Sequence, residues 1–198
     1  NMIHELYPKA HIENVEIDPS VIKVARDYFN FIETDKVTAK VQDGRIFIKR
    51  AALKKQQFDW IILDAFNGDY IPEHLLTKEF FEEIKSVLAE DGIVAANTFS
   101  SSKLYEHESA TYHAVFGDFI NVTANNNSNR IILAGYSNIP TEQQIAQRVT
   151  QLAPLLAPYD VDIKAISQRM FFTKDGQDWP SDTKVLTDQY SPANLLNF

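Results

Sequence analysis

The sequence predicts an α/β fold, with a doubly wound and mostly parallel sheet flanked by helices. Short segments rich in β-branched and apolar residues recur through the first two-thirds of the 198-residue chain. Stretches with the apolar spacing of helices lie between the early ones, as in α/β proteins. The chain is 44% hydrophobic and 12% aromatic, which suffices for one well-buried core. We therefore expect a single domain over residues 1–198.

Six segments have the composition of strands: Ile12–Ile17, Val37–Gln42, Trp60–Ala65, Gly92–Thr98, Phe119–Ala124 and Arg130–Gly135. The continuous apolar run Trp60–Leu63 is typical of a central parallel strand that is buried on both faces. The last two strands follow one another across the polar turn Asn125–Asn129. This turn predicts an antiparallel hairpin at the edge of the sheet.

Helical spacing of apolar residues predicts four main helices: Pro19–Phe31, Thr77–Leu88, the weaker Ser101–Phe116, and Thr141–Leu156. The first has Asp18 as a candidate N-cap and Pro19 at its first position, where the missing N–H has no cost. The second is expected to close at the Asp91-Gly92 pair.

The net charge and the absence of cysteine limit the classes of ligand and site that the protein can have. With 27 acidic and 19 basic residues and a formal charge of -8, the chain lacks the positive field that nucleic-acid binding requires. Cationic or neutral small molecules suit it better. The absence of cysteine excludes disulfides and thiolate metal sites and fits a reducing compartment. No apolar run approaches the roughly 20 residues of a membrane span, so we expect a soluble, cytoplasmic protein without membrane or nucleic-acid partners.

Acidic residues lie at the ends of three predicted strands. Glu16 and Asp18 end the first, Asp43 precedes Gly44 at the end of the second, and Asp64 ends the third. Ligands of open α/β sheets bind outside the carboxyl ends of the strands. A carboxylate there can accept hydrogen bonds from both ribose hydroxyls. The alternative is structural: Asp18 caps the helix, Glu16 is solvated, and Asp64 caps a loop.

These acidic residues lie in segments that resemble successive motifs of the spermidine synthases and their spermidine-synthase-like relatives. The segments are Glu16–Pro19, Asp43-Gly44, Asp64 with Ile71–Phe81, and Val185–Leu196 near the end of the chain. The main resemblance runs from about His4 to Gly135. It implies a Rossmann-type, methyltransferase-like sheet and a ligand derived from S-adenosylmethionine.

The resemblance also implies roles for individual residues. In that family the residue matching Glu16 binds the ribose, the one matching Asp43 contacts the adenine amino group, and the one matching Asp64 is the catalytic acid-base carboxylate. The predicted site is therefore catalytic Asp64, cofactor-binding Glu16, Asp18, Asp43 and Gly44, and substrate-binding Asn67, Asp69 and Tyr70. The implied protein is a transferase of polyamine biosynthesis that uses decarboxylated S-adenosylmethionine or S-adenosylmethionine and an amine acceptor. His107 and His113 lack the spacing of metal ligands, so no metal is expected. A fragment without the family's first strand would leave unpaired sheet edges, which predicts a homo-oligomer.

Three departures from the family pattern keep other functions open. Family members carry a first strand and a Gly-rich loop before the segment matching Asn1–Tyr7, and we expect this chain to be a fragment without them. Spermidine synthases usually have a second Asp at the position of Asn67, and in this chain the next acidic residue is Asp69, two positions further on. The polyamine-using members also have a Pro- and Tyr-containing segment at the position of Asn121–Asn127. The alternatives are an S-adenosylmethionine-dependent methyltransferase and a non-catalytic binding or oligomerisation protein.

Overall fold

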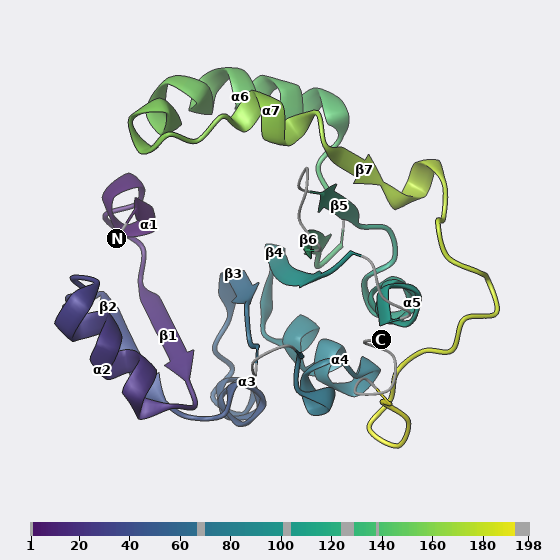
Figure 1. Cartoon of the computed structure of the whole chain (residues 1–198), viewed down its shortest axis with the longest axis horizontal. Helices are drawn as coiled ribbons and strands as arrows, with labels where there is room; N and C mark the ends of the chain where they lie inside the picture. Colours follow the sequence, from purple (N-terminus) through teal and green to yellow (C-terminus); the bar gives the residue numbers. More distant parts are fainter. Residues whose placement is uncertain (1, 67–69, 101–103, 124–128, 138, 193–198) are drawn as a thin grey trace. The chain divides into compact units, whose positions relative to one another are not determined.

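The chain folds into two compact units, Asn1–Lys55 and Gln56–Phe198, and each has its own sheet (Figure 1). The computed structural model describes residues 2–66, 70–100, 104–123, 129–137 and 139–192. Within these ranges no helix combines the length and the apolar character that crossing a membrane requires. The α/β class is confirmed, whereas the single domain that the sequence predicts stays a prediction.

The first unit is built on a pair of parallel strands, β1 (Ile12–Glu16) and β2 (Val37–Val41), with Ile12 beside Val37 and Glu16 beside Val41. Its helices are α1 (Met2–Leu6), α2 (Pro19–Tyr28) and α3 (Gly44–Leu53). Because the strands are parallel, their carboxyl ends lie side by side, and each end leads directly into a helix.

The second unit contains a five-stranded sheet in the order β3-β4-β6-β5-β7. Its strands are β3 (Phe58–Leu63), β4 (Leu88–Phe99), β5 (Ile120–Thr123), β6 (Asn129–Gly135) and β7 (Met170–Phe172). Strands β3 and β4 are parallel, and the other pairs are antiparallel. The helices are η1 (Glu73–Leu75), α4 (Lys78–Ser86), α5 (Leu104–Phe116), α6 (Glu142–Leu156), η2 (Ala157–Tyr159), α7 (Ile163–Ser167) and η3 (Thr173–Asp175).

All six predicted strands and all four predicted helices are present. Strand β4 begins four residues earlier than predicted, at Leu88. The first three residues of the helix predicted at Ser101–Phe116 lie outside the described ranges. The predicted hairpin is the antiparallel pair of β5 and β6. It is not at the edge of the sheet, because β7 pairs with β5 through Ile120 and Phe172. Strand β7 and helices α1, α3 and α7 are additional to the prediction.

The prediction that Trp60–Leu63 is buried on both faces is wrong. Trp60 and Ile62 are 50% and 54% exposed, whereas Ile61 between them is buried. Successive side chains of a strand point to opposite faces, and Ile61 lies beside Val94 on the side that α5 covers. Among the described residues β3 pairs with one strand only, β4, so it behaves as an edge strand with one solvated face.

The prediction that Asp91-Gly92 closes the helix after Thr77 is also wrong. Helix α4 ends at Ser86, and both residues of the pair lie inside β4. Close packing of the backbone explains why position 92 is a glycine: a Cβ at Gly92 would lie 2.9 Å from the carbonyl oxygen of Ala89 and 3.0 Å from that of Phe58. It allows a close approach of backbone at the irregular start of the β3–β4 pairing.

The core lies between one face of the larger sheet and the helices α4 and α5. Aromatic rings join the two helices and the sheet: the centroids of Phe81 and Tyr112 are 4.1 Å apart, those of Tyr112 and Phe119 are 6.3 Å apart, and Phe119 stacks on Trp179. The fully buried sheet residues Val94, Ile132 and Ala134 lie in the same core.

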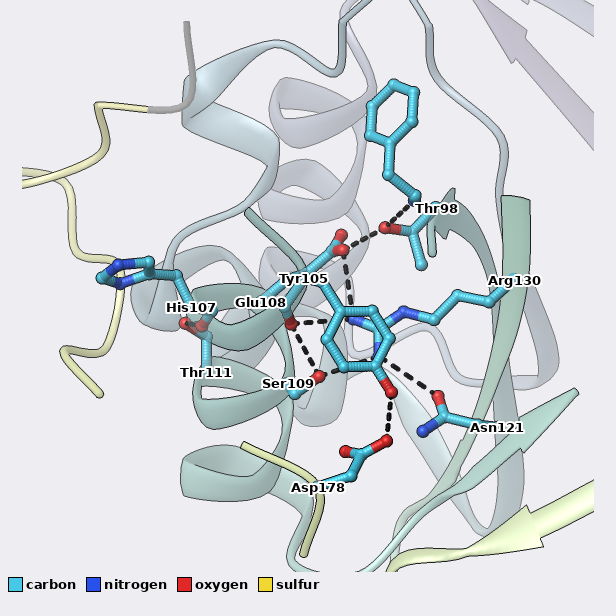
Figure 2. Close-up of polar contacts among 10 residues, drawn as sticks. Thr98, Tyr105, His107, Glu108, Ser109, Thr111, Asn121, Arg130 and Asp178 are labelled. Atoms are coloured by element: carbon cyan, nitrogen blue, oxygen red, sulfur yellow. Dashed lines mark hydrogen bonds and ion pairs between the residues drawn. The ribbon is translucent and has the colours of Figure 1, made fainter. Parts of the chain in front are cut away.

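A buried ion pair crosses this core between α5 and β6 (Figure 2). Glu108 and Arg130 are each 1% exposed, and Nη2 of Arg130 lies 3.4 Å from Oε2 of Glu108. The hydroxyl of Thr98, on β4, donates a hydrogen bond to the same carboxylate. Burial raises the pKa of Glu108, and the neighbouring Arg130 charge opposes this rise.

Further partners of Arg130 come from α5 and β5. Its Nη1 donates to Oγ of Ser109 at 2.8 Å and to Oδ1 of Asn121 at 3.3 Å. Its Nη2 also donates to the carbonyl oxygen of Tyr105 at 3.1 Å, and the guanidinium lies 3.7 Å from the centre of the Tyr105 ring. The Tyr105 hydroxyl in turn donates to Asp178. The arginine therefore ties α5 to the sheet by several contacts.

Replacing Arg130 with methionine is expected to destabilise the protein by about 3–5 kcal/mol, because it leaves Glu108 buried without a cation. Urea unfolding followed by circular dichroism measures this loss. The double variant Glu108→Leu/Arg130→Met removes both charges and should recover most of the stability. Equal stability of the single and double variants would contradict the assignment.

Glu108→Gln is expected to change how stability depends on pH. The pKa of Glu108 is raised in the folded state. Its contribution to stability is therefore complete at pH values below its pKa in the unfolded chain, and is lost as the pH rises through its pKa in the folded protein. The glutamine variant lacks this loss, so its stability relative to the native protein should increase as pH rises above the ordinary glutamate pKa of about 4.5. A constant difference as the pH rises above this value, measured by urea unfolding at each pH, would refute the raised pKa.

Candidate functional site

Two of the predicted site residues lie at the start of α2 in the first unit. Asp18 is the N-cap of this helix: its Oδ1 accepts a hydrogen bond from the backbone N–H of Ser20 at 2.7 Å. Glu16 is half-buried at the end of β1, and its Oε1 accepts from the backbone N–H of Asp18 at 2.9 Å. The predicted cap with Pro19 after it is confirmed. Capping occupies one oxygen of each carboxylate, and each oxygen has a second lone pair for a ligand.

Asp43 repeats this arrangement at the start of α3. Its Oδ1 accepts from the backbone N–H of Ile46 at 2.9 Å, so the residue is the N-cap of the helix. Gly44 is the first helical residue, and a Cβ there would meet no atom within 4 Å. Packing among the described residues of the first unit therefore does not explain this glycine. Since Gln42 N–H also bonds the carbonyl of Glu16 at 3.0 Å, the two capped strand ends lie together.

The third carboxylate, Asp64, lies in the second unit directly after β3, with its side chain exposed. Its Oδ1 accepts a hydrogen bond from Nδ2 of Asn97 at 2.9 Å. Oδ1 of Asn97 accepts in turn from Nδ2 of Asn129 at 3.0 Å. Sequence reasoning missed both asparagines. The available signal was a polar residue near the carboxyl end of the strand predicted at Gly92–Thr98.

The predicted amine site follows Asp64 along the chain. Tyr70 is half-buried, and Asn67 and Asp69 lie outside the described residues. Glu16, Asp18, Asp43 and Gly44 belong to the first unit, and Asp64 and Tyr70 belong to the second. The geometry of the predicted site is therefore described within each unit separately.

The loop after Asp64 is anchored by a small apolar cluster. Ile71 and Leu76 pack with Leu104 and with Leu186, which the C-terminal segment supplies, and Phe66, Leu75 and Phe99 cover the cluster. The rings of Phe66 and Phe99 meet edge to face with centroids 5.4 Å apart. These contacts attach the chain on both sides of the candidate amine site to the body of the second unit.

Hydrogen bonds hold the C-terminal segment against the same loop. The backbone N–H of Lys78 donates to the carbonyl oxygen of Leu186 at 2.8 Å, and the Thr77 hydroxyl donates to Asp188 at 2.7 Å. The Ser191 hydroxyl donates to the carbonyl oxygen of Glu73 at 3.2 Å. Residues more than 100 positions away thus fix the loop that follows Asp64. Among the described residues, no three His, Cys, Asp or Glu side chains are grouped so as to hold a metal ion.

The sequence of this chain is similar to that of a known enzyme. A polyamine aminopropyltransferase of Vibrio vulnificus is 47% identical over 193 residues, which are 97% of this chain and 64% of that protein. This chain thus spans less than two-thirds of that relative's length.

Two solved structures share the fold. A probable spermidine synthase from Corynebacterium glutamicum has a TM-score of 0.68 at 20% identity, covering 93% of this chain and 66% of that one. Human methyltransferase-like protein 13 in complex with SAH has a TM-score of 0.64 at 24% identity, covering 95% and 82%. These likenesses confirm the methyltransferase-like α/β fold. The family described as "Spermine/spermidine synthase domain" matches residues 1–128, and the chain belongs to this family.

Proposed function

We propose that the full-length protein is an aminopropyltransferase that acts on decarboxylated S-adenosylmethionine and an amine, a polyamine or its diamine precursor. The observation that carries the proposal is the Asp64 carboxylate, exposed at the carboxyl end of β3 and held there by Asn97, in a chain of the spermine/spermidine synthase family. The similarity to the Vibrio vulnificus aminopropyltransferase over 97% of the chain supports the same reaction.

In the proposed reaction, the lone pair of the amine nitrogen attacks the propyl carbon next to the sulfonium. A C–N bond forms, the C–S bond breaks, and its electron pair goes to sulfur, which leaves neutral methylthioadenosine. The amine must lose a proton before or as it attacks, and in this proposal Asp64 accepts that proton or holds the amine in line. The net negative charge of the chain attracts the cationic reactants.

The remaining predicted residues have binding roles in this proposal. Glu16 accepts hydrogen bonds from the ribose and Asp43 from the adenine amino group, with Asp18 and Gly44 beside them, and Asn67, Asp69 and Tyr70 contact the amine. The reaction needs no metal. We further propose a cytoplasmic homo-oligomer, which the absence of cysteine and the solvated apolar edge strand with Trp60 and Ile62 support.

A methyltransferase is the second candidate. The fold shared with human methyltransferase-like protein 13 and the position of Asn67 where spermidine synthases have an Asp favour it. Product analysis separates the candidates: the full-length protein, given diamines with either decarboxylated or ordinary S-adenosylmethionine, should yield aminopropylated amine and methylthioadenosine from the decarboxylated form. Methylated product from the ordinary form would support the second candidate, and failure of both nucleotides to bind would indicate a non-catalytic protein.

In the full-length protein, Asp64→Asn is expected to lower the single-turnover rate by roughly 10²–10⁴-fold, because the amide keeps the shape of the carboxylate but cannot accept the proton. Nucleotide affinity should change little. Asp59→Asn is the matched control, since Asp59 is an exposed carboxylate on the same strand. If Asp64 only caps a loop, the variant should lose about 1 kcal/mol of stability and keep its rate.

Glu16→Gln is expected to do the reverse and weaken nucleotide binding more than it slows the bound-state reaction, since one ribose acceptor is lost. Calorimetric titration with decarboxylated S-adenosylmethionine and single-turnover rates at saturation measure the two effects. Glu13→Gln, at the other end of β1, is the control. Native affinity in the Glu16 variant would remove Glu16 from the nucleoside site.

A further inference from the structure

We propose that Asn97 is a positioning residue for the reaction, and that it acts by holding the Asp64 carboxylate in one orientation. The inference rests on the proposed function of Asp64. It follows from three features of the second unit: the register of β3 and β4, the direction of the Asn97 amide, and the distribution of hydrogen bonds over the two carboxylate oxygens.

The strand register places the two side chains together. Leu63 lies beside Ala96 in the parallel pair of β3 and β4, so the next residues along each strand, Asp64 and Asn97, are neighbours at the carboxyl edge of the sheet. The 2.9 Å hydrogen bond from Nδ2 of Asn97 to Oδ1 of Asp64 joins them. A side chain on a central strand of a sheet is a more rigid support than one on a loop.

Asn129 supports the orientation in which the amide nitrogen of Asn97 faces the Asp64 carboxylate, which can only accept. A primary amide has one accepting and one donating end. Nδ2 of Asn129, at the start of β6, donates to Oδ1 of Asn97 at 3.0 Å, so the accepting end of the Asn97 amide is used on that side. The donating end is thereby directed at Asp64. A reversed amide would place two acceptor oxygens against each other at Asp64 and two donors against each other at Asn129.

The consequence concerns the two oxygens of Asp64. Oδ1 accepts the hydrogen bond from Asn97, whereas no hydrogen bond to Oδ2 is formed by the described residues. The asparagine therefore restrains rotation of the carboxylate and leaves Oδ2 as the acceptor for the amine. Fixed orientation of this kind matters because a misplacement of about 1 Å can cost on the order of 10²-fold in rate.

A double-mutant cycle in the full-length protein tests the proposal. Asn97→Ala should lower kcat by roughly 10–100-fold and leave the dissociation constant of the nucleotide unchanged, because the nucleoside residues are elsewhere. In the Asp64→Asn background, where the carboxylate is already lost, Asn97→Ala should cause little further loss. In the control background Asp59→Asn, the full loss should persist. Asn97→Gln, which retains an amide, should lose less than Asn97→Ala.

Thermal unfolding of every variant shows whether it is folded. If the Asn97 variants do not fold, Asn129→Ala serves instead: it frees the amide to rotate and should lower kcat in the same direction, again only while Asp64 is present. An Asn97→Ala loss that persists in full in the Asp64→Asn background, or an unchanged kcat in the Asn97 and Asn129 variants, would overturn the positioning role alone. An unchanged rate in Asp64→Asn would instead overturn the proposed function, and the inference with it.

Discussion

The charge that Arg130 carries into the core is the constraint on which the second unit depends. A buried guanidinium without partners is so costly that its donors must be met. Here the donors on Nη1 and Nη2 are met by Glu108, Ser109 and the Tyr105 carbonyl on α5, and by Asn121 on β5. Helix α5 cannot move along the sheet without breaking several of these bonds at once. Among the described residues Nε of Arg130 has no acceptor, so the pair serves geometry more than net stability.

The same network determines which side chains of β4 point to each face of the sheet. Thr98 donates to Glu108 inside the core, and successive strand residues alternate in direction, so Asn97 must point to the opposite face. There it meets Asp64. A slip of one residue in the register of β4 would exchange the two side chains, and a hydroxyl would replace the amide beside the candidate catalytic carboxylate. Burial on one face of the strand thus specifies chemistry on the other.

The sequence predicted what depends on near neighbours in the chain. Asp18 before Pro19 identifies a capped helix start, and alternating segments identify the strands, because caps and strand periods are local properties. The errors and omissions depend on distant residues. The exposure of Trp60 depends on what packs against that face of β3, and the need for glycine at position 92 follows from the close approach of the Phe58 carbonyl oxygen. Asn97 and Asp64 are 33 positions apart, so spacing along the chain does not reveal their bond.

The acidic strand ends also differ from one another in a way that agrees with the roles proposed for them. Asp18 and Asp43 cap helices, where the positive end of the helix dipole and the backbone N–H groups stabilise a fixed negative charge. Such carboxylates are suited to accept hydrogen bonds from hydroxyl or amino groups of a ligand. Asp64 follows a strand instead, and its described hydrogen bond comes from the side-chain amide of Asn97 on the neighbouring strand β4. Asp18 and Asp43 are thus oriented by the helix that each one begins, whereas Asp64 is oriented across the sheet by β4, where its second oxygen faces no described hydrogen-bond donor and suits contact with a reactant.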